Sequence, residues 1–414
     1  MILIINRLFK SLKQPGLGPD YRRALIARAV SWTGSALTLV ALPVLVFELT
    51  QSAAWTATLT IVETAPYLFF GIAAGVFADR TSRKWMMIWC AAVAALCTGI
   101  VPFAWYVGWL SLPLLLIVAL CSGIALVFFD AAVFGLIPSL VEKENIPQAT
   151  ASAMSWSTLI RLIGPMLGGF LLTIMPPAGL LALDAVSFAV AALLLLGVSE
   201  SLTPVRNQAV TWFSDLGKGL KFLWKHSLVR FLTILGAANS LIGGVVTALL
   251  VPQAVNTYAV SSSGGWMGFF FAALSVGALL SSVILPRLKA SPSGYFFWGM
   301  LVSAAGILLW ALSSEPVLGL IGLAVYQGGS SLVILNGISV RTQATPLQMQ
   351  GRINSVARTV AWGGQPLGAA LVVIFVKPEV SLLLIVASVA AVLTALIGGY
   401  LLHRLSKRDE MMTE

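Results

Sequence analysis

The chain has 414 residues, of which 58% are hydrophobic and only 10% are charged, and its formal net charge is +10. A soluble protein of this length must face water with its exterior, so this composition excludes an ordinary soluble domain. A positive balance would suit nucleic acid in a soluble chain, but here the cations lie at the ends of apolar runs. We therefore expect the protein to lie in a lipid bilayer and to have no nucleic-acid partner.

The apolar runs predict an all-α membrane protein with about twelve transmembrane helices, because each span needs about 20 mainly apolar residues. The runs are rich in Leu, Ala, Val and Gly and lack the two-residue alternation of membrane barrel strands. In chain order, we expect the spans at about 25–47, 54–78, 84–108, 111–138, 148–174, 178–198, 228–254, 265–286, 293–313, 316–340, 349–376 and 380–403.

The basic side chains predict how the spans are oriented. The segment INRLFKSLKQPG is basic and leads directly into the first span, which argues against a cleaved secretory signal. When the N-terminus is placed in the cytoplasm, nearly all Lys and Arg residues of the loops lie inside, and Lys377 lies outside. We therefore expect an even number of spans and both termini in the cytoplasm.

Cysteine, histidine and loop motifs give no sign of a cofactor. Cys90, Cys97 and Cys121 lie within expected spans and are expected to be free thiols that pack as small apolar groups. His226 and His403 lie near helix ends, which argues against a histidine metal site. The sequence has no G-x-x-x-x-G-K-[ST] loop for a nucleotide. We therefore expect no metal and no other cofactor, and any transport would use an ion gradient or run downhill.

A long polar interruption divides the expected spans into two groups. We predict an N-terminal bundle at 1–200, a cytoplasmic linker with an interfacial helix at 201–227, and a C-terminal bundle with a basic tail at 228–414. The groups resemble each other, since GPMLGG at 164–169 matches GQPLGA at 364–369. Any two helices rich in Gly and Ala could look alike. A true repeat predicts pseudo-two-fold symmetry with the working site between the halves.

The stretch GVFADRTSRK, which begins at Gly75, places four charges at the inner end of an apolar run. Gly75 lets a neighbouring helix come close, and Asp79 can meet a helix N-terminus or an arginine. Arg80, Arg83 and Lys84 are expected among lipid headgroups, where they can pair with acidic groups. The alternative is positive-inside anchoring, which explains Arg83 and Lys84 but not the aspartate.

This motif, the number of spans, the inner termini and the repeat together resemble the major facilitator superfamily over almost the whole chain. The resemblance implies two pseudo-symmetric bundles of six helices that rock about a central substrate cavity, usually as a monomer. It also implies that Gly75, Asp79, Arg80, Arg83 and Lys84 form a conformational latch of the outward-facing state, with Asp79 and Arg80 at its centre.

The stretch RLIGPMLGG in the fifth expected span carries Gly164, Pro165, Gly168 and Gly169. It resembles the later part of the antiporter motif of proton-coupled drug exporters, although Ile160 stands where that motif has glycine. A Gly-Pro pair kinks a membrane helix and small residues permit close packing, so a hinge or a seal is expected here. The alternative is ordinary packing of small residues.

Two stretches that begin with IPSLVEKENIPQ and LQMQGRINSVAR resemble the subfamily of enterobactin exporters and macrolide-efflux proteins. The GRIN sequence at 351–354 is especially similar. This resemblance implies an export pump for a medium-sized, partly hydrophobic compound, in the inner or plasma membrane of a bacterium.

Four ionisable residues lie inside expected spans, where charge is costly, and they are candidates for proton coupling: Asp130, Arg161, Glu63 and Arg358. We expect Asp130 to pair with Arg161, so that protonation of Asp130 would release the arginine and bias the conformational switch. A permanent structural ion pair is the alternative, and Glu63 is the rival proton carrier. We expect Asp184, near the outer end of its span, to be solvated.

Aromatic and polar residues of several spans are candidates for the substrate cavity, because such a mixture suits an amphipathic organic ligand. They are Trp32, Ser35, Phe128, Phe129, Asn239, Tyr326, Gln327, Asn336, Trp362 and Gln365. For each of these residues the alternative is helix packing or a helix–helix hydrogen bond.

These features predict a secondary active exporter rather than an enzyme. It would exchange protons for an amphipathic organic compound, either a drug or a siderophore-like molecule, by alternating access. The alternatives are a facilitator or symporter for small organic solutes and a lipid scramblase. An intramembrane enzyme would need paired catalytic groups deep in the spans, and neither histidine lies there.

Overall fold

The computed structural model describes residues 17–199, 221, 224, 226–260, 265–284, 290–345, 357, 359–375 and 380–411. Within these residues the chain consists of α-helices joined by short connections, with a 3-10 helix at Lys143–Asn145 and no β-strand. The all-α fold class expected from the apolar runs is confirmed for this part of the chain.

The N-terminal helices have ends that local sequence signals explain. The helices are α2 (Pro19–Thr50), α3 (Ala53–Arg80), α4 (Arg83–Val107), α5 (Leu112–Leu140), α6 (Ile146–Leu171) and α7 (Pro177–Leu196). The Ser82 hydroxyl accepts a hydrogen bond from the Trp85 N–H at 3.5 Å where α4 begins, and Gly108, at φ 78°, lies just past its end. Prolines occupy the first turns of α5, α6 and α7, where a missing N–H costs nothing.

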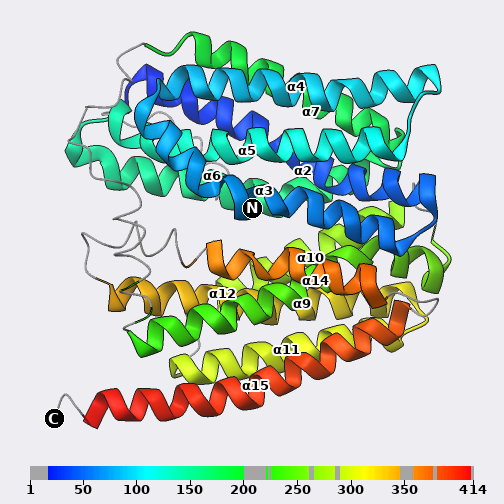
Figure 1. The fold of residues 1–414 in the computed structure, drawn as a ribbon, viewed down its shortest axis with the longest axis vertical. Helices are drawn as coiled ribbons and strands as arrows, with labels where there is room; N and C mark the ends of the chain where they lie inside the picture. The colour runs from blue at the N-terminus through cyan, green and yellow to red at the C-terminus, as the bar shows by residue number, and fades with distance from the viewer. Residues whose placement is uncertain are drawn as a thin grey trace. The chain divides into compact units, whose positions relative to one another are not determined.

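The C-terminal helices form a second set, and within each set the helices run alongside one another (Figure 1). These helices are α9 (Ser227–Tyr258), α10 (Gly265–Ile284), α11 (Pro292–Leu312), α12 (Pro316–Ala344), α14 (Gly364–Phe375) and α15 (Val380–Met411). Ser291 caps α11 by accepting a hydrogen bond from the Gly294 N–H at 3.1 Å.

Nine helices in the described residues are long and apolar enough to cross a membrane: α2, α4, α5, α7, α9, α10, α11, α12 and α15. A shorter apolar helix runs over Thr359–Phe375. Each expected span overlaps a helix, although the span at about 349–376 is described only in its later part. The total of about twelve spans stays a prediction.

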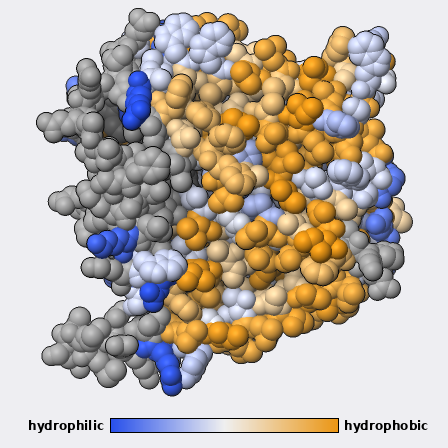
Figure 2. All heavy atoms as spheres, viewed as in Figure 1, coloured by the Kyte–Doolittle hydropathy of each residue, from blue (hydrophilic) through white to orange (hydrophobic). Residues whose placement is uncertain are grey.

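Hydrophobic side chains cover broad areas of the described surface (Figure 2). Large apolar residues are exposed on several helices, for example Leu96 at 76%, Leu193 at 67% and Ile374 at 68%. A continuous apolar surface of this extent would drive aggregation in water, whereas lipid chains accept it in a bilayer. The chain is therefore a multi-pass membrane protein.

The chain divides into two compact units. The first unit comprises Met1–Leu49 and Pro66–Gln208, and the second comprises Thr50–Ala65 and Ala209–Glu414. The first part of α3 thus groups with the second unit, whereas the sequence places the whole of that span in the N-terminal bundle. The interfacial helix expected at 201–227 lies almost entirely outside the described residues, so the division into bundles and linker stays a prediction.

Alanines let the helices of the first unit approach one another closely. Ala27 on α2, Ala91 on α4, Ala132 on α5 and Ala191 on α7 are fully buried in one cluster. Lipid chains are as apolar as these side chains, so helix association in a membrane depends on close van der Waals contact. This packing brings α2 and α5 together, and the charged residues of these two helices lie within it.

Candidate functional site

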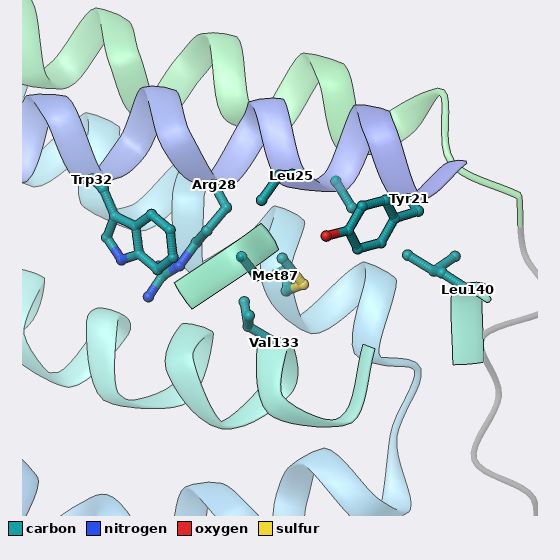
Figure 3. Close-up of a pocket in the computed structure, with 9 residues that line it drawn as sticks. Tyr21, Leu25, Arg28, Trp32, Met87, Val133 and Leu140 are labelled. Atoms are coloured by element: carbon teal, nitrogen blue, oxygen red, sulfur yellow. The ribbon is translucent and has the colours of Figure 1, made fainter. Parts of the chain in front are cut away.

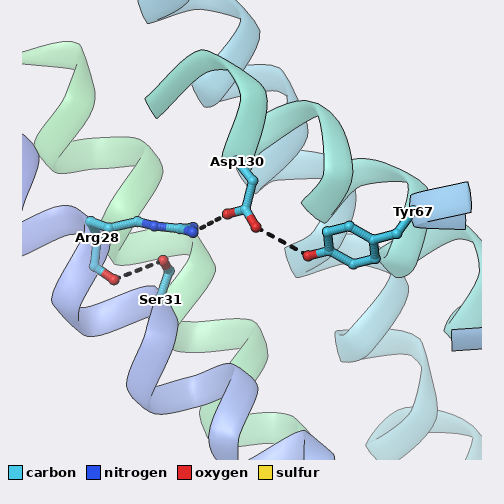
Figure 4. A network of polar contacts seen from close by, with 4 residues as sticks. All are labelled: Arg28, Ser31, Tyr67 and Asp130. Carbon is cyan, nitrogen blue, oxygen red and sulfur yellow. Dashed lines mark hydrogen bonds and ion pairs between the residues drawn. The ribbon is translucent and has the colours of Figure 1, made fainter. Parts of the chain in front are cut away.

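An aspartate, an arginine and a tyrosine meet inside the first unit (Figure 4). The guanidinium of Arg28 on α2 donates to the Asp130 carboxylate on α5 and forms an ion pair with it. The hydroxyl of Tyr67 on α3 donates to the other carboxylate oxygen at 3.1 Å. The side chain of Arg28 is 7% exposed and that of Asp130 is 23% exposed. The three residues form one largely buried polar network.

The network lies well inside the helices rather than at their ends. Arg28 stands nine residues after the start of α2, about 14 Å along the helix. Asp130 stands ten residues before the end of α5, about 15 Å along it. A single charge at this depth is costly, so each residue needs the other.

Two aromatic rings complete the surroundings of Arg28. Its guanidinium carbon lies 4.5 Å from the ring centre of Trp32 and 4.8 Å from that of Phe129. Trp32 follows Arg28 by one helical turn, and Phe129 precedes Asp130 on α5. Aromatic faces attract cations, so the rings hold the guanidinium even where hydrogen-bond partners are missing. Two of the candidate cavity residues thus touch the charged network.

The expected pairing of Asp130 with Arg161 is wrong. Among the described residues, the cation that contacts Asp130 is Arg28, and the side chain of Arg161 is exposed. The first span was expected to begin at about residue 25, which leaves Arg28 near the headgroups. The helix begins at Pro19 instead and carries Arg28 inward. The spacing of Arg28 and Trp32, one turn apart on a helix, is a sequence signal that could have indicated this.

Tyr67→Phe is expected to lower the free energy of unfolding by about 1–2 kcal/mol, because it removes a hydrogen bond to a charged group but leaves the Arg28–Asp130 pair. Thermal melting of the detergent-solubilised protein measures this. Tyr106→Phe is the matched control, since Tyr106 is 85% exposed and should melt as the wild type. Equal melting of both variants would show that the Tyr67 bond adds nothing to stability.

A small cavity of about 30 Å³ lies beside the network (Figure 3). It is lined by side chains of α2, α4, α5 and α6, namely Tyr21, Ala24, Leu25, Arg28, Trp32, Met87, Val133, Leu140 and Ala153. The Nε and Nη1 atoms of Arg28 have no hydrogen-bond partner among the described residues. The cavity has room for one or two water molecules but not for an organic substrate.

The glycines of the antiporter-like motif face α2. A methyl group on Gly164 would collide with the Ala36 side chain, and one on Gly168 would lie 3.1 Å from a methyl of Val40. These glycines therefore let α6 pack closely against α2. Pro165 lies inside α6 and Gly169 is buried. Close packing is what the motif does in this structure, and a role as a hinge or a seal stays a prediction.

The second unit repeats this arrangement. A methyl group on Gly364 would collide with the backbone of Ala237, and one on Gly368 with the backbone of Leu241. In each unit, therefore, two glycines four residues apart let one helix pack closely against the first long helix of that unit. The correspondence holds for the helix partners as well as for the glycines. It supports the repeat inferred from GPMLGG and GQPLGA on grounds beyond composition.

The latch candidates lie around the connection between α3 and α4. Gly75 is half-buried, Arg80 is the exposed last residue of α3, and Arg83 is the first residue of α4. Lys84, the second residue of α4, is 8% exposed, and its ammonium lies 5.7 Å from the Trp85 ring centre. Its place among lipid headgroups stays a prediction. The Asp79 side chain lies outside the described part, and the latch stays a prediction.

The remaining cavity candidates of the first unit are half-buried. Ser35 lies on α2, and Phe128 on α5 contacts the ring of Phe77 edge to face, with the ring centres 5.9 Å apart. Among the described residues, neither side chain forms a hydrogen bond or an ion pair with the charged network. Their role in a substrate cavity stays a prediction.

The polar candidates of the second unit bond within that unit. The Asn239 amide donates to the Ser330 hydroxyl at 3.0 Å, the Asn336 amide donates to a backbone carbonyl of α11 at 2.8 Å, and the Gln327 amide donates to the Ser331 hydroxyl at 3.3 Å. The first two amides and Tyr326 are at most 4% exposed. Trp362 is 40% exposed and Gln365 is half-buried.

The other proton-coupling candidates do not join the network. Glu63 is half-buried on the part of α3 that groups with the second unit. Arg358 and the GRIN sequence at 351–354 lie outside the described residues. Asp184, which we expected to be solvated, is only 1% exposed. That expectation is wrong because α7 turns this residue toward α2 rather than toward the membrane surface.

The chain has long apolar helices, close helix contacts at paired glycines in both units, and a charged network inside the first unit. Together these features define a multi-pass transporter with the major facilitator fold. Solved transporters share this fold. The nucleoside transporter NupG matches with a TM-score of 0.69 at 15% identity, over 92% of this chain and 98% of that one. A bacterial homologue of the iron transporter ferroportin, in the inward-facing state, matches with a TM-score of 0.71 at 16% identity, over 92% and 97%.

The family model described as transmembrane secretion effector matches residues 18–413, so the chain belongs to this family of the major facilitator superfamily. The enterobactin exporter EntS of Escherichia coli O81 (strain ED1a) is 28% identical over 362 residues, which cover 85% of this chain and 84% of EntS. The sequence-based assignment to this superfamily, with its resemblance to enterobactin exporters, is confirmed.

Proposed function

We propose that the protein is a secondary active exporter that exchanges protons for an amphipathic organic compound by rocker-switch alternating access. The observation that carries this proposal is the buried ion pair of Arg28 with Asp130, to which Tyr67 adds a hydrogen bond. Ionisable residues inside a membrane bundle are expensive and mark proton relays and substrate paths. Membership of the secretion effector family supports a role in export.

In the proposed cycle, a proton from water binds a carboxylate oxygen of Asp130. The neutral acid no longer attracts the guanidinium, so Arg28 is released from the ion pair. The Nε and Nη1 atoms of Arg28 already lack partners among the described residues and can turn to water or to substrate. Loss of the proton re-forms the pair. The protonation state of Asp130 thus biases the equilibrium between the two facing states.

The small cavity supports a route for that proton. Its lining runs from Tyr21, near the start of α2, to Arg28 and Trp32. One or two water molecules fit there and would bond the free guanidinium nitrogens. Water beside Arg28 would connect one end of the bundle with the ion pair.

We infer that the substrate is an aromatic or partly hydrophobic organic molecule, such as a drug or a siderophore. The relative from Escherichia coli is by its name an enterobactin exporter. The rings of Trp32 and Phe129 beside a cation would suit a ligand with both aromatic and anionic groups. The membrane would be the inner membrane of a bacterium, with both termini in the cytoplasm because the loop cations lie on that side. We expect a monomer.

We also propose that Asp79 and Arg80, with Gly75, Arg83 and Lys84, latch the outward-facing state. The motif lies at the connection between α3 and α4, and its four charged residues are close together in the sequence there. An acidic residue among three cations can pair with basic groups or with a helix N-terminus in one state and release them in the other.

The proposed coupling is tested with the protein in liposomes that have an acidic lumen, using enterobactin and erythromycin as separate probes. We expect the wild type to accumulate a probe only with the pH gradient, because protons leave as the probe enters. Asp130→Asn should lose the gradient-driven part at least tenfold, since the amide cannot take up a proton. Glu63→Gln should keep most of it. Glu144→Gln, at an exposed site on the 3-10 helix, is the matched control.

Each other result contradicts a stated part of the proposal. Full gradient-driven accumulation in both Asp130→Asn and Glu63→Gln would rule out these carboxylates as proton carriers. Loss in Glu63→Gln alone would move the proton from Asp130 to Glu63. Equilibration of the probe without a gradient would indicate a facilitator, and movement of labelled lipid alone would indicate a scramblase.

A further inference from the structure

A second buried carboxylate lies in the first unit, away from the Arg28–Asp130 pair. Asp184 on α7 is 1% exposed. The Thr38 hydroxyl on α2 donates to its Oδ2 atom at 2.6 Å. The Ser187 hydroxyl, one turn further along α7, lies 3.2 Å from the Oδ1 atom. Two helices thus enclose this carboxyl group with hydroxyls.

The hydroxyls around Asp184 can accept a proton from it as well as donate to it. The Ser187 hydroxyl has one proton, and its oxygen lies 2.8 Å from the Asp184 backbone carbonyl, which can only accept, and 3.2 Å from Oδ1. If Asp184 is ionised, this single proton must serve both acceptors. If Asp184 is protonated, Ser187 can donate to the carbonyl and accept from the carboxyl group, so that each contact is a full hydrogen bond.

No cation offsets the charge that an ionised Asp184 would carry. Among the described residues, no Lys, Arg or His nitrogen lies within ion-pair distance of it. A methyl group on Gly34 of α2 would collide with Ser187 Oγ and Asp184 Oδ1. The carboxyl group therefore lies directly against the α2 backbone, where a hydrated cation has no room. An isolated buried carboxylate is far more costly than a neutral acid.

Ionisable groups on the packed helices lie elsewhere. On α2 the nearest in sequence are Arg28, six residues before Gly34 and about 9 Å along the axis, and Glu48, ten residues after Thr38 and about 15 Å along it. Arg28 is engaged with Asp130. On α4, Gly99 is opposite Ala185 of α7. The ionisable groups of α4 are those of Arg83, Lys84, Cys90, Cys97 and Tyr106, and Tyr106 is 85% exposed.

We propose that Asp184 is a second proton-binding site of the transporter, and that it holds its proton as a neutral carboxylic acid between α2 and α7. The acid donates to Ser187 Oγ and accepts from Thr38 at the other oxygen. When α2 and α7 part or water reaches the site, the proton leaves to water and the carboxylate remains. Re-formation of the close contact at Gly34 then requires a proton from water.

The position of the site gives it a consequence for transport, which rests on the proposed function. The helix α2 carries both Arg28 of the ion pair and Thr38 of this cluster. A change of charge at Asp184 would act on the same helix that holds Arg28. With two proton-dependent contacts on one helix, the equilibrium between the inward-facing and outward-facing states would change more steeply with pH than with one contact alone.

Infrared spectroscopy of the protein in lipid, without substrate, tests whether Asp184 is protonated. We expect a carboxylic-acid C=O band at neutral pH that is lost in Asp184→Asn and retained in the matched variant Asp130→Asn. Thr38→Val should retain the band but shift it to higher frequency, because one hydrogen bond to the carbonyl oxygen is lost. A purely structural role would not link a protonated-acid band to these two residues.

The opposite outcomes are equally clear. A wild-type spectrum without this band, or with a band that Asp184→Asn leaves unchanged, overturns the proposal. A band that appears only after sodium and potassium are removed would assign the site to a metal cation instead. If Asp184→Asn does not fold, an unshifted band in Thr38→Val and Ser187→Ala overturns the proposal. None of these readouts depends on export, so the proposed function can fail separately.

Discussion

Arg28→Leu is expected to reduce gradient-driven export at least tenfold and to lower the free energy of unfolding by about 3–5 kcal/mol. The substitution leaves Asp130 without its cation in a largely buried position. Most of the loss in stability comes from the unpaired carboxylate, not from the arginine side chain. Thermal melting in detergent and uptake into liposomes with an acidic lumen measure the two effects.

The double variant Arg28→Leu/Asp130→Asn separates these contributions. It removes both charges, so it should melt closer to the wild type than Arg28→Leu does, while export stays lost. Arg161→Leu is the matched control, because Arg161 is an exposed arginine on α6 that does not pair with Asp130. Its melting temperature should change least. If Arg28→Leu melts at the wild-type temperature, the ion pair does not stabilise the unit.

How far the sequence predicts this site depends on what sets each position. The identity of Asp130 as an intramembrane charge follows from hydropathy alone, because a carboxylate within an apolar run is costly wherever it lies. Its partner does not follow. Hydropathy places helix ends only to within a few residues, and six residues at the start of α2 move Arg28 from the headgroups into the bundle.

Asp184 illustrates the same limit in another form. Depth along a helix can be read from the sequence, but the direction in which a side chain points depends on tertiary packing. The face of α7 that carries Asp184 and Ser187 is turned toward α2, at the one place where Gly34 leaves room. An isolated hydropathy plot contains no information about that contact.

The repeat was predictable because it depends on residue size rather than on side-chain direction. A glycine within a membrane helix has few uses besides close approach. The match of GPMLGG with GQPLGA therefore indicates equivalent helix contacts as well as similar composition. In the structure, Gly164 and Gly364 each face the first long helix of their own unit.

Gly368→Ala is expected to destabilise the protein by about 1–3 kcal/mol, whereas Gly168→Ala should cost less than about 1 kcal/mol. The new methyl group at 368 would collide with the Leu241 carbonyl and lie 3.1 Å from the Val245 N–H nitrogen, both of the α9 backbone. A backbone cannot turn aside, so α9 and α14 must move apart. At 168 the nearest atoms belong to the Val40 side chain, at 3.1 and 3.3 Å, which small shifts accommodate.

Thermal melting of the two variants beside Gly337→Ala tests this difference with one chemical change throughout. Gly337 lies on α12 with no atom within 4 Å of the position that a methyl group would take, so this control should melt at or above the wild-type temperature. The expected order of melting temperatures places Gly368→Ala lowest. Equal melting temperatures of Gly168→Ala and Gly368→Ala would mean that the two helix contacts tolerate the same increase in volume. Their difference in backbone contact would then have no energetic consequence, and the close approach of α14 to α9 could not be what fixes that helix pair.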